Sequence, residues 1–336
     1  MIDVIIATYN RPKIINSIVA DIQNRHLHSV NHIIVVDSTD EENSTLKKQK
    51  GVIYIHSSHK NQPYQRYLGY NLADSDNVLF LDDDMQILDD GVFSQVDDIL
   101  NNKDICGINL AFKNFNTFLL KQHSHRYGAT NNKTIQYLVR VFQTLSGRPT
   151  LKAGKMWYCG LRGKRVNGQY AEFFFGGAFA AKRNVLYNNF NFDIFSLYEK
   201  RIGKGEDAVL AYTLSKQGKI YNLPGEYLFH NDPGNSTYTS NNKSFQYRVA
   251  FSRMYMSKEY ARLNKKPLFT AILTTFWYNL WRSVGLFCSS IKTGGFTGFI
   301  GYVNGSLTSA KLLFQKNENN YWLSEIKSDL NANASF

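Results

Sequence analysis

The chain has few cysteines and no sequence that resembles an export signal. Its 336 residues include only Cys106, Cys159 and Cys288, which are far apart and form no CxxC pair. An odd number of distant cysteines excludes a disulfide framework and argues against a cysteine-based zinc site. The opening residues, MIDVIIATYN, lack the positive charge that begins a signal peptide and instead predict a first strand. We therefore expect a protein of the reducing cytoplasm.

Acidic residues are outnumbered by basic ones. The chain has 27 Asp and Glu against 39 Lys and Arg, which gives a net charge of +12. Such a charge favours anionic partners: phosphorylated small molecules, an anionic bilayer or nucleic acid. No nucleic-acid-binding motif is present, and the acids cluster where a ligand is expected to bind, so we expect no nucleic-acid partner. A hydrophobic content of 43% is typical of a globular protein with a sizeable core.

No apolar run is long enough to be a clear membrane span. The uncharged stretch from Pro267 to Trp281 has about 15 residues, whereas a span needs about 20, and Arg282 follows it. Three interpretations of the segment 267–291 stay open: a helix lying on a membrane surface, a helix packed on protein or on another subunit, and a spanning helix. The basic residues around it favour the membrane surface, so we expect peripheral attachment to the inner face of the cell membrane.

Short apolar runs alternate with helical patterns at the start of the chain. Strands are expected at 3–7, 32–36, 52–55 and 77–81, and helices at 14–22 and 63–73. This alternation is typical of an α/β fold with a mainly parallel sheet covered by helices on both faces. Polar clusters follow three of these strands, at Thr8–Arg11, Asp37–Asp40 and Asp82–Asp84. Because ligands bind beyond the carboxyl ends of such strands, the three clusters predict one crevice.

The rest of the chain has a less regular pattern. We expect a strand at 105–112, a helix near 134–145, a basic loop or hairpin at 152–168, a strand broken by Gly176 and Gly177, a helix after Glu206, and a short strand before His230. The sequence shows no internal repeat and no low-complexity linker.

The run Asp82, Asp83 and Asp84 follows the fourth expected strand directly. Alternation along an extended strand would place Asp82 and Asp84 on one side and Asp83 on the other. Two carboxylates on the same side can hold Mg²⁺ or Mn²⁺, whose remaining positions go to water and a substrate diphosphate. The alternative is a solvated acidic turn or a cap for the next helix. The position at the end of a central strand favours the metal.

Five segments together resemble the family 2 glycosyltransferases of the GT-A fold. They are VIIATYNRP, IIVVDSTD, YQRYLGYNLADSDNVLFLDDDM, FFFGGAFAAKR and GEDAVLAYTLSKQGK, with a late histidine, in matching order over about residues 1–235. The resemblance implies a Rossmann-like, mixed, mainly parallel sheet, and transfer of a sugar from a nucleotide diphosphate donor with inversion. It implies a catalytic domain at 1–240, with a nucleotide-sugar half at about 1–112 and an acceptor half at about 113–240. A helical C-terminal region at 241–336 would serve the membrane surface or oligomerisation.

The resemblance also implies roles for single residues on the donor side. Contacts to the nucleotide sugar are implied for Thr8, Tyr9, Arg11, Asp37, Arg66, Asp82, Asp83, Gly176 and Gly177. Asp37 resembles the acid that reads the imide of uracil, which favours a UDP-sugar, and Asp82 resembles the residue that holds the ribose. The glycine pair resembles the loop under the transferred sugar, although it is equally consistent with a strand break. Asp83 is expected to point away, and its role is open.

On the reacting side, Asp84 resembles the direct metal ligand, and His230 matches a late histidine that completes the metal site in some family members. The cofactor would then be Mn²⁺ or Mg²⁺. A lone histidine can equally be structural. Asp207 resembles the base that takes the acceptor proton, and Glu206 would position it or bind the acceptor. Two acids at a helix start also complement the helix dipole, which is the structural alternative. The family often has Asn after the residue matched by Arg66, whereas this chain has Tyr67.

Three functions compete at this point. The first is a glycosyltransferase with a single base, acting on a glycan or on a polyprenyl-diphosphate-linked acceptor. The second is a nucleotidyltransferase, which usually opens with a glycine-rich phosphate loop; the corresponding ATYNRPK has no glycine. The third is a non-catalytic glycan-binding protein. The acids at the expected crevice favour the first, and homo-oligomer formation is left open.

Overall fold

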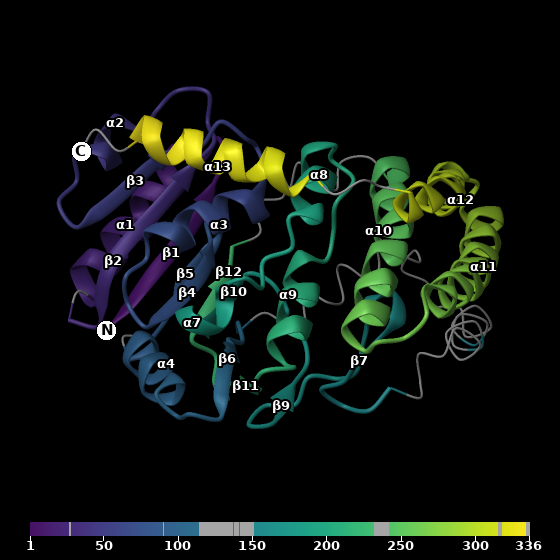
Figure 1. Cartoon of the computed structure of the whole chain (residues 1–336), viewed down its shortest axis with the longest axis horizontal. Helices are drawn as coiled ribbons and strands as arrows, with labels where there is room; N and C mark the ends of the chain where they lie inside the picture. Colours follow the sequence, from purple (N-terminus) through teal and green to yellow (C-terminus); the bar gives the residue numbers. More distant parts are fainter. Residues whose placement is uncertain are drawn as a thin grey trace.

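The computed structural model describes residues 1–26, 28–89, 91–113, 151–231, 242–314 and 318–333, together with positions 137 and 141. Within these ranges the chain forms an eight-stranded sheet with helices on both faces, and further helices gather beyond one edge (Figure 1). The expected α/β class with a mixed, mainly parallel sheet is confirmed. Of the helix expected near 134–145, only Tyr137 and Val141 are described, and both are helical.

The sheet has the strand order β3-β2-β1-β4-β10-β6-β11-β9. Its strands are β1 (Ile2–Thr8), β2 (Val30–Asp37), β3 (Val52–His56), β4 (Asn77–Asp82), β6 (Ile105–Asn109), β9 (Tyr170–Ala171), β10 (Ala178–Lys182) and β11 (Lys219–Asn222). The four strands β3, β2, β1 and β4 are parallel neighbours, and β10 runs antiparallel between β4 and β6. Residues 4–7 of β1, 33–36 of β2 and 78–81 of β4 form unbroken apolar runs because both faces of the sheet are covered.

Two layers of helices cover the sheet. On one face lie α1 (Pro12–His26) and α4 (Val92–Leu100), and on the other lie α3 (Gln62–Leu72), α8 (Asp193–Glu199) and α9 (Glu206–Leu214); the short α2 (Ser44–Lys47) and α7 (Arg183–Leu186) lie at connections. As the helical spacing predicts, Ile15, Val19 and Ile22 of α1 are fully buried. Helix α3 begins after Asn61, whose side chain accepts a hydrogen bond from the Tyr64 amide.

Two short ladders extend the fold around the sheet. Strand β5 (Met85–Ile87) pairs antiparallel with β12 (Leu228–His230), and β7 (Met156–Trp157) pairs with β8 (Leu161–Arg162) across the turn Tyr158–Gly160. The basic stretch therefore forms the hairpin rather than the loop of the two alternatives. The expected strand before the glycine pair is wrong, because residues 172–175 form no strand. The chain turns at Gly176 and Gly177, with φ of +71° and +84°, before it enters the sheet as β10.

The C-terminal region consists of α10 (Asn242–Leu263), α11 (Leu268–Thr293), α12 (Thr297–Thr308), the 3₁₀ turn η3 (Ser309–Leu313) and α13 (Asn319–Asn333). Helices α10 and α12 pack with their backbones close together, because a side chain at Gly301 or Gly305 would meet a carbonyl oxygen of α10 at 2.2 Å. Helix α13 returns across the first half of the chain, as Figure 1 shows, and Trp322 is buried there. None of the helices in the described ranges has the length and apolar character that a bilayer span requires.

Candidate active site

Three neighbouring strands bring the predicted polar clusters to one edge of the sheet. In the register of the parallel ladders, Thr8 at the end of β1 pairs with Asp37 at the end of β2, and Ala7 pairs with Asp82 at the end of β4. The three polar clusters therefore meet at one edge of the sheet, at the carboxyl ends of β1, β2 and β4, as the sequence predicts. The side chains in this crevice are arranged differently from the simple alternation expected of them.

Asp83 anchors the turn after β1. Thr8 Oγ1 donates a hydrogen bond to Asp83 Oδ2 at 2.7 Å, and Arg11 Nη1 donates to Asp83 Oδ1 at 2.5 Å. The same Arg11 nitrogen lies 3.5 Å from Asp84 Oδ2. Alternation fails here because β4 ends at Asp82, and the turn that follows places Asp83 and Asp84 on the same arginine. The side chains of Thr8 and Arg11, predicted to contact the nucleotide, are therefore engaged by Asp83.

Asp82 belongs to a second network, centred on Arg66. Arg66 Nη2 donates to Asp82 Oδ1 at 2.6 Å, and Gln62 Nε2 donates to the same oxygen at 2.9 Å. Arg66 Nη1 reaches Glu206 Oε1 at 3.3 Å, and Tyr198 Oη donates to the other oxygen of Glu206. Burial alone would lower the pKa of Arg66, but the charges of Asp82 and Glu206 outweigh it and raise that pKa. Arg66 thus joins the end of β4 to the start of α9.

Asp84 and His230 face each other at the end of the sheet. Asp84 Oδ1 is buried and accepts no hydrogen bond from the described residues, and His230 Nε2 lies 3.5 Å from it. Burial and the charges of Asp82 and Asp83 raise the pKa of Asp84 to about 7. The ladder of β5 with β12 fixes this pair, because it sets His230 opposite Met85, the residue after Asp84. A buried carboxylate oxygen without a donor needs a proton or a cation.

The glycine pair lies between the two acidic groups. The carbonyl oxygen of Gly177 accepts the Asp82 amide at 2.7 Å. A Cβ atom at Gly177 would meet Met85 Cε at 2.2 Å, and a Cβ atom at Gly176 would lie 3.0 Å from Asp207 Oδ2. A side chain at either position would therefore clash with Met85 or crowd the Asp207 carboxylate. Glycine at these two positions lets the backbone pass close to Met85 and to the Asp207 carboxylate.

Asp207 has the environment of a base. It stands in the first turn of α9, its Oδ1 accepts the Ala208 amide at 2.8 Å, and its Oδ2 lies 3.8 Å from Arg162 Nη1. Burial and the neighbouring Glu206 raise the pKa of Asp207, and the cation of Arg162 opposes them. Glu206 is different, since both of its oxygens already accept hydrogen bonds. Arg66, Glu206 and Asp207 border a cavity whose other walls are mainly apolar: Phe80, Phe179, Phe190, Ile194, Phe195, Val209, Leu210 and Tyr255.

The residues predicted to hold the base and ribose differ in their exposure. Asp37 is 2% exposed; its Oδ1 accepts the amide and hydroxyl hydrogens of Thr39, and its Oδ2 accepts the Tyr54 hydroxyl at 3.1 Å. Tyr9 is 37% exposed, and Lys60 Nζ lies 4.9 Å from the centre of its ring. The exposed aromatic side chain among these residues is therefore Tyr9, whereas Asp37 is buried and bonded within the protein.

Three residues of the site were not predicted from the sequence as site residues: Lys60, Arg162 and Tyr198. Arg162 lies in the basic stretch 152–168, but the sequence does not show that its guanidinium lies near Asp207. Lys60 and Tyr198 carry no local signal, because their contacts to Tyr9 and Glu206 are tertiary.

Comparison with known proteins finds a match in the first half of the chain. Residues 3–161 match the family model described as glycosyl transferase family 2. This part of the chain is therefore similar to the family 2 glycosyltransferases. The matched segment contains the sites after β1, β2 and β4, whereas Gly176, Gly177, Glu206, Asp207 and His230 lie beyond it. The roles inferred for those five residues remain predictions.

Several solved structures are similar to the chain, and the first of them supports the fold. A mannosyltransferase of Pyrobaculum calidifontis, solved with GDP-Man and Mn²⁺, is 13% identical, with 99% of this chain and 87% of that chain covered and a TM-score of 0.52. Residues 1–349 of S. aureus TarS are 11% identical, with 92% and 91% covered and a TM-score of 0.48. The Mycobacterium tuberculosis glucosyl-3-phosphoglycerate synthase with Mn²⁺, UDP and glucosyl-3-phosphoglycerate is 14% identical, with 80% and 81% covered and a TM-score of 0.42. No curated protein sequence matches the chain.

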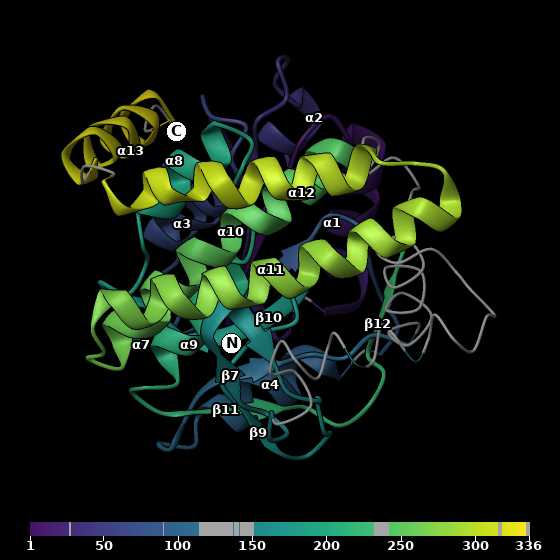
Figure 2. The ribbon, with the colours of Figure 1, turned by 90° about the vertical axis from the view of Figure 1, so that its right-hand side faces the viewer.

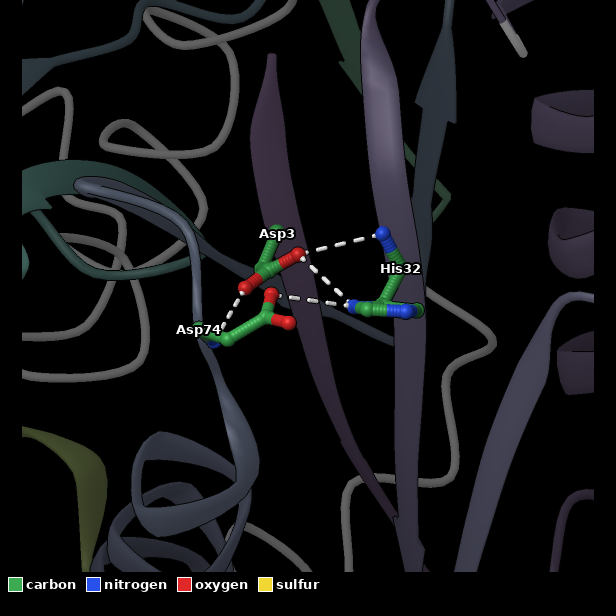
Figure 3. Close-up of side chains that lie close together, drawn as sticks. All are labelled: Asp3, His32 and Asp74. Carbon is green, nitrogen blue, oxygen red and sulfur yellow. Dashed lines mark hydrogen bonds and ion pairs between the residues drawn. The ribbon is translucent and has the colours of Figure 1, made fainter.

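Within the described part of the chain, two groups offer metal-ligand atoms. Asp84 and His230 lie in the crevice, and an orphaned carboxylate oxygen beside an imidazole suits Mn²⁺ or Mg²⁺. The second group is Asp3, His32 and Asp74 (Figure 3), whose ligand atoms lie within 4.8 Å of one another. Asp3 is at the opposite end of β1, five residues or about 17 Å from Thr8.

Hydrogen bonds already saturate the Asp3 carboxylate. Its Oδ2 accepts the amides of Asp74 and Ser75, both at 2.8 Å, and its Oδ1 accepts the His32 amide at 3.1 Å and Asn31 Nδ2 at 3.2 Å. These bonds tie the loop after α3 to the starts of β1 and β2. We therefore interpret this group as a structural latch, whereas the residues at Asp84 fit a metal.

Replacing the latch should cost stability and leave metal dependence unchanged. Asp3→Ala leaves buried amides without acceptors, so the free energy of unfolding is expected to fall by about 2–4 kcal/mol. Urea unfolding with and without EDTA measures it. As a control, Asp104→Asn removes an acid that is 70% exposed and should change little. An EDTA-sensitive stability that Asp3→Ala abolishes would instead show a metal at this end of the sheet.

Proposed function

We propose that the protein is an inverting glycosyltransferase that moves a sugar from a nucleotide diphosphate donor to an acceptor hydroxyl, with Asp207 as base. The observation that supports it best is the division of labour between two acidic centres. Asp84 has an unused buried oxygen beside His230, and Asp207 stands across the glycine pair with its second oxygen open to an acceptor. A metal held by Asp84 and His230 would neutralise the charge that develops on the leaving diphosphate.

The protein's own residues account for the other requirements of the reaction. Asp207 accepts the proton of the attacking hydroxyl, and its raised pKa makes it a stronger base than an exposed aspartate. Arg162 steers the carboxylate at 3.8 Å, and Glu206 is held by Arg66 and Tyr198 so that it positions the start of α9. A single displacement needs one base and no carboxylate nucleophile, whereas a glycoside hydrolase would need two flanking carboxyl groups. Among the described residues, Asp207 is the one carboxyl group that we assign to the acceptor side.

The donor we propose is a UDP-sugar. This choice rests on Asp37, whose carboxylate lies at the end of β2 behind Tyr9, where the edge of a stacked uracil would approach. The carboxylate would have to exchange or share its bonds with Thr39 and Tyr54 to read the imide. Tyr9 supplies the stacking surface, and Asp82 keeps its Oδ2 for the ribose, because among the described residues both donors use Oδ1.

The acceptor we propose is a lipid-linked or growing surface glycan, such as one on a polyprenyl diphosphate. The basic hairpin that carries Arg162 and the aromatic C-terminal helices support this acceptor. On the same grounds we propose that the protein lies at the inner face of the membrane. The alternative of a nucleotidyltransferase has no supporting observation, since no glycine-rich loop follows β1.

Thermal stabilisation by a panel of nucleotide sugars tests the donor. We expect UDP-sugars with Mn²⁺ to raise the melting temperature, because a ligand at a hundred times its Kd raises the free energy of unfolding by about 2.7 kcal/mol. GDP- and CMP-sugars should leave the melting temperature unchanged. Free UDP, without pyrophosphate, is the expected product. Asp37→Asn should weaken the preference for uridine, because an amide presents a donor to the imide hydrogen. A GDP-sugar that stabilises more strongly than UDP-sugars would show that Asp37 does not select the base.

A further inference from the structure

Helix α11 turns its largest apolar side chains outward, whereas a helix that packs on a core buries them. Its exposed residues are large and apolar: Leu268, Phe269, Leu273, Phe276, Trp277, Leu280, Phe287 and Ile291. Phe269 and Phe276 are 63% and 65% exposed. Its buried side chains include Thr275, Asn279 and Arg282; Asn279 Oδ1 accepts the Tyr302 hydroxyl at 2.8 Å, and Arg282 lies over the Tyr302 ring. The buried side is mixed, because Ala271, Tyr278 and Leu286 are buried together with these polar residues, whereas the large apolar stripe faces outward.

The neighbouring helix extends this surface. Phe296, Ile300 and Leu307 of the α12 region are exposed, and so is Phe314 after it. Figure 2 looks onto α11 and α12, which run side by side across one face of the molecule. We call these exposed residues the α11–α12 face. Helix α11 alone has 26 residues, or about 39 Å, and its exposed apolar residues recur along it from Leu268 to Ile291.

The charged residues in the segment that carries the face are all basic. From residue 260 to residue 317 the sequence contains no Asp or Glu, but it contains seven bases: Arg262, Lys265, Lys266, Arg282, Lys292, Lys311 and Lys316. Of these, Arg262, Lys265, Lys266 and Lys311 are exposed in the described part of the chain. An anionic bilayer complements such a segment, because acyl chains accept the aromatic stripe and headgroups meet the lysines. A second copy of the chain would bring the same cations to a self-complementary interface.

We propose that the α11–α12 face docks on an anionic membrane with α11 in the plane of the bilayer. Helix α11 is too polar on its inner side to cross the bilayer, and Arg282 is buried against protein rather than lipid. The face is also connected to the active site. Tyr158 Oη lies 2.8 Å from Thr270 Oγ1 of α11, and Arg162, on the same β7–β8 hairpin, lies beside Asp207. This second step rests on the proposed function: docking would hold the base at the height of an acceptor's headgroup.

Vesicle sedimentation tests the docking directly. The triple variant Phe269→Ser, Leu273→Ser, Phe276→Ser removes one side of the stripe at spacings of four and three residues. We expect wild type to sediment with vesicles of phosphatidylcholine and phosphatidylglycerol, and the variant to partition at least about tenfold more weakly. The double variant Lys265→Glu, Lys266→Glu should lose the preference for phosphatidylglycerol over phosphatidylcholine alone, and high salt should reduce it in wild type.

The matched control replaces three equally exposed apolar residues elsewhere, Tyr170→Ser, Tyr187→Ser and Leu323→Ser, which are 52%, 67% and 48% exposed. This control should bind vesicles as wild type does, and circular dichroism should show all variants folded. The proposal is overturned if wild type stays in the supernatant, or if the α11 variant sediments equally. It is also overturned if wild type is a dimer in solution that the α11 variant converts to a monomer. Donor hydrolysis in solution should be equal in wild type and the α11 variant; its absence from wild type would count against the proposed function and leave the vesicle result standing.

Discussion

Asp207→Asn is expected to lower kcat for sugar transfer by about 10²- to 10⁴-fold while donor affinity stays within a factor of about three. The amide is close in shape to the carboxylate and can still accept the Ala208 amide, but it takes no proton from the acceptor. Removing a charge near Arg162 and Glu206 also relieves repulsion, so the variant should fold. Steady-state kinetics with the donor found in the thermal panel measure kcat, and titration calorimetry measures donor binding.

The pH profile separates a base from a helix-end charge. Burial and Glu206 raise the pKa of Asp207, and the base must be ionised to act. The rate should therefore fall as the pH drops through that raised pKa, at a higher pH than for an ordinary aspartate, and this acidic limb should disappear in Asp207→Asn.

Asp193 provides a matched control, because it also stands in the first turn of a helix, α8. Asp193→Asn should keep kcat within about threefold, since its contribution is limited to the helix dipole. Equal losses in Asp193→Asn and Asp207→Asn would show that both acids serve the fold. Retention of full activity in Asp207→Asn would remove the base from the proposal altogether.

The edge of the sheet was predictable from the sequence because it depends on local patterns. Apolar β-branched runs mark strands, and in a parallel sheet their carboxyl ends meet, so Thr8, Asp37 and Asp82 were expected together and lie together. The helix after Glu206 was predictable for the same reason, as its apolar periodicity and glycine entry are local.

The partners within the crevice were not predictable, because they are set by contacts distant in sequence. Asp83 binds Thr8 and Arg11 rather than pointing away, since the length of β4 decides where alternation stops. Arg66 was expected near the base or diphosphate, yet it bridges Asp82 and Glu206, which are 124 positions apart in the sequence. A one-dimensional pattern does not specify which carboxylate an arginine will reach.

The segment 267–291 shows a third case. Its composition left open a surface helix, a packed helix and a span, because hydropathy alone does not say which side of a helix is buried. The structure shows that Arg282, Asn279 and Thr275 are on the buried side and that the largest apolar side chains face outward. This orientation leaves an apolar stripe that can bind a partner.

Asp84→Asn is expected to stabilise the metal-free fold and to abolish metal-dependent transfer. In the folded protein the pKa of Asp84 is raised from 3.8 to about 7, chiefly by burial and by the charges of Asp82 and Asp83. A raised carboxylate pKa means that the native state binds the proton more tightly than the unfolded chain. The stability of the wild type should therefore fall as the pH rises from about 4 to about 7, and the full penalty should persist at higher pH.

The asparagine carries no charge to bury. About one pH unit above the pKa of Asp84, the free energy of unfolding of the variant should therefore exceed that of wild type by on the order of 2 kcal/mol. Thermal unfolding in EDTA measures this gain. Transfer should fall by about 10³-fold, because the variant loses a carboxylate ligand and with it the stabilisation of the leaving diphosphate. In wild type the apparent affinity for Mn²⁺ should weaken about tenfold for each pH unit below about 7, because the proton and the metal compete for Asp84.

The two readouts together decide what the orphaned oxygen is for. Adding Mn²⁺ at a pH above 7 should raise the melting temperature of wild type, and it should have little effect on Asp84→Asn. A variant that is less stable than wild type in EDTA would mean that Asp84 has a stabilising partner in the metal-free fold. That result would contradict the interpretation of its buried Oδ1, which accepts no hydrogen bond among the described residues. A variant that is more stable but still transfers sugar with Mn²⁺ would place the metal elsewhere. The proposal requires that Asp84→Asn is more stable than wild type in EDTA and that it no longer responds to Mn²⁺. Both results together would show that the charged Asp84 carboxylate destabilises the metal-free fold and binds a cation.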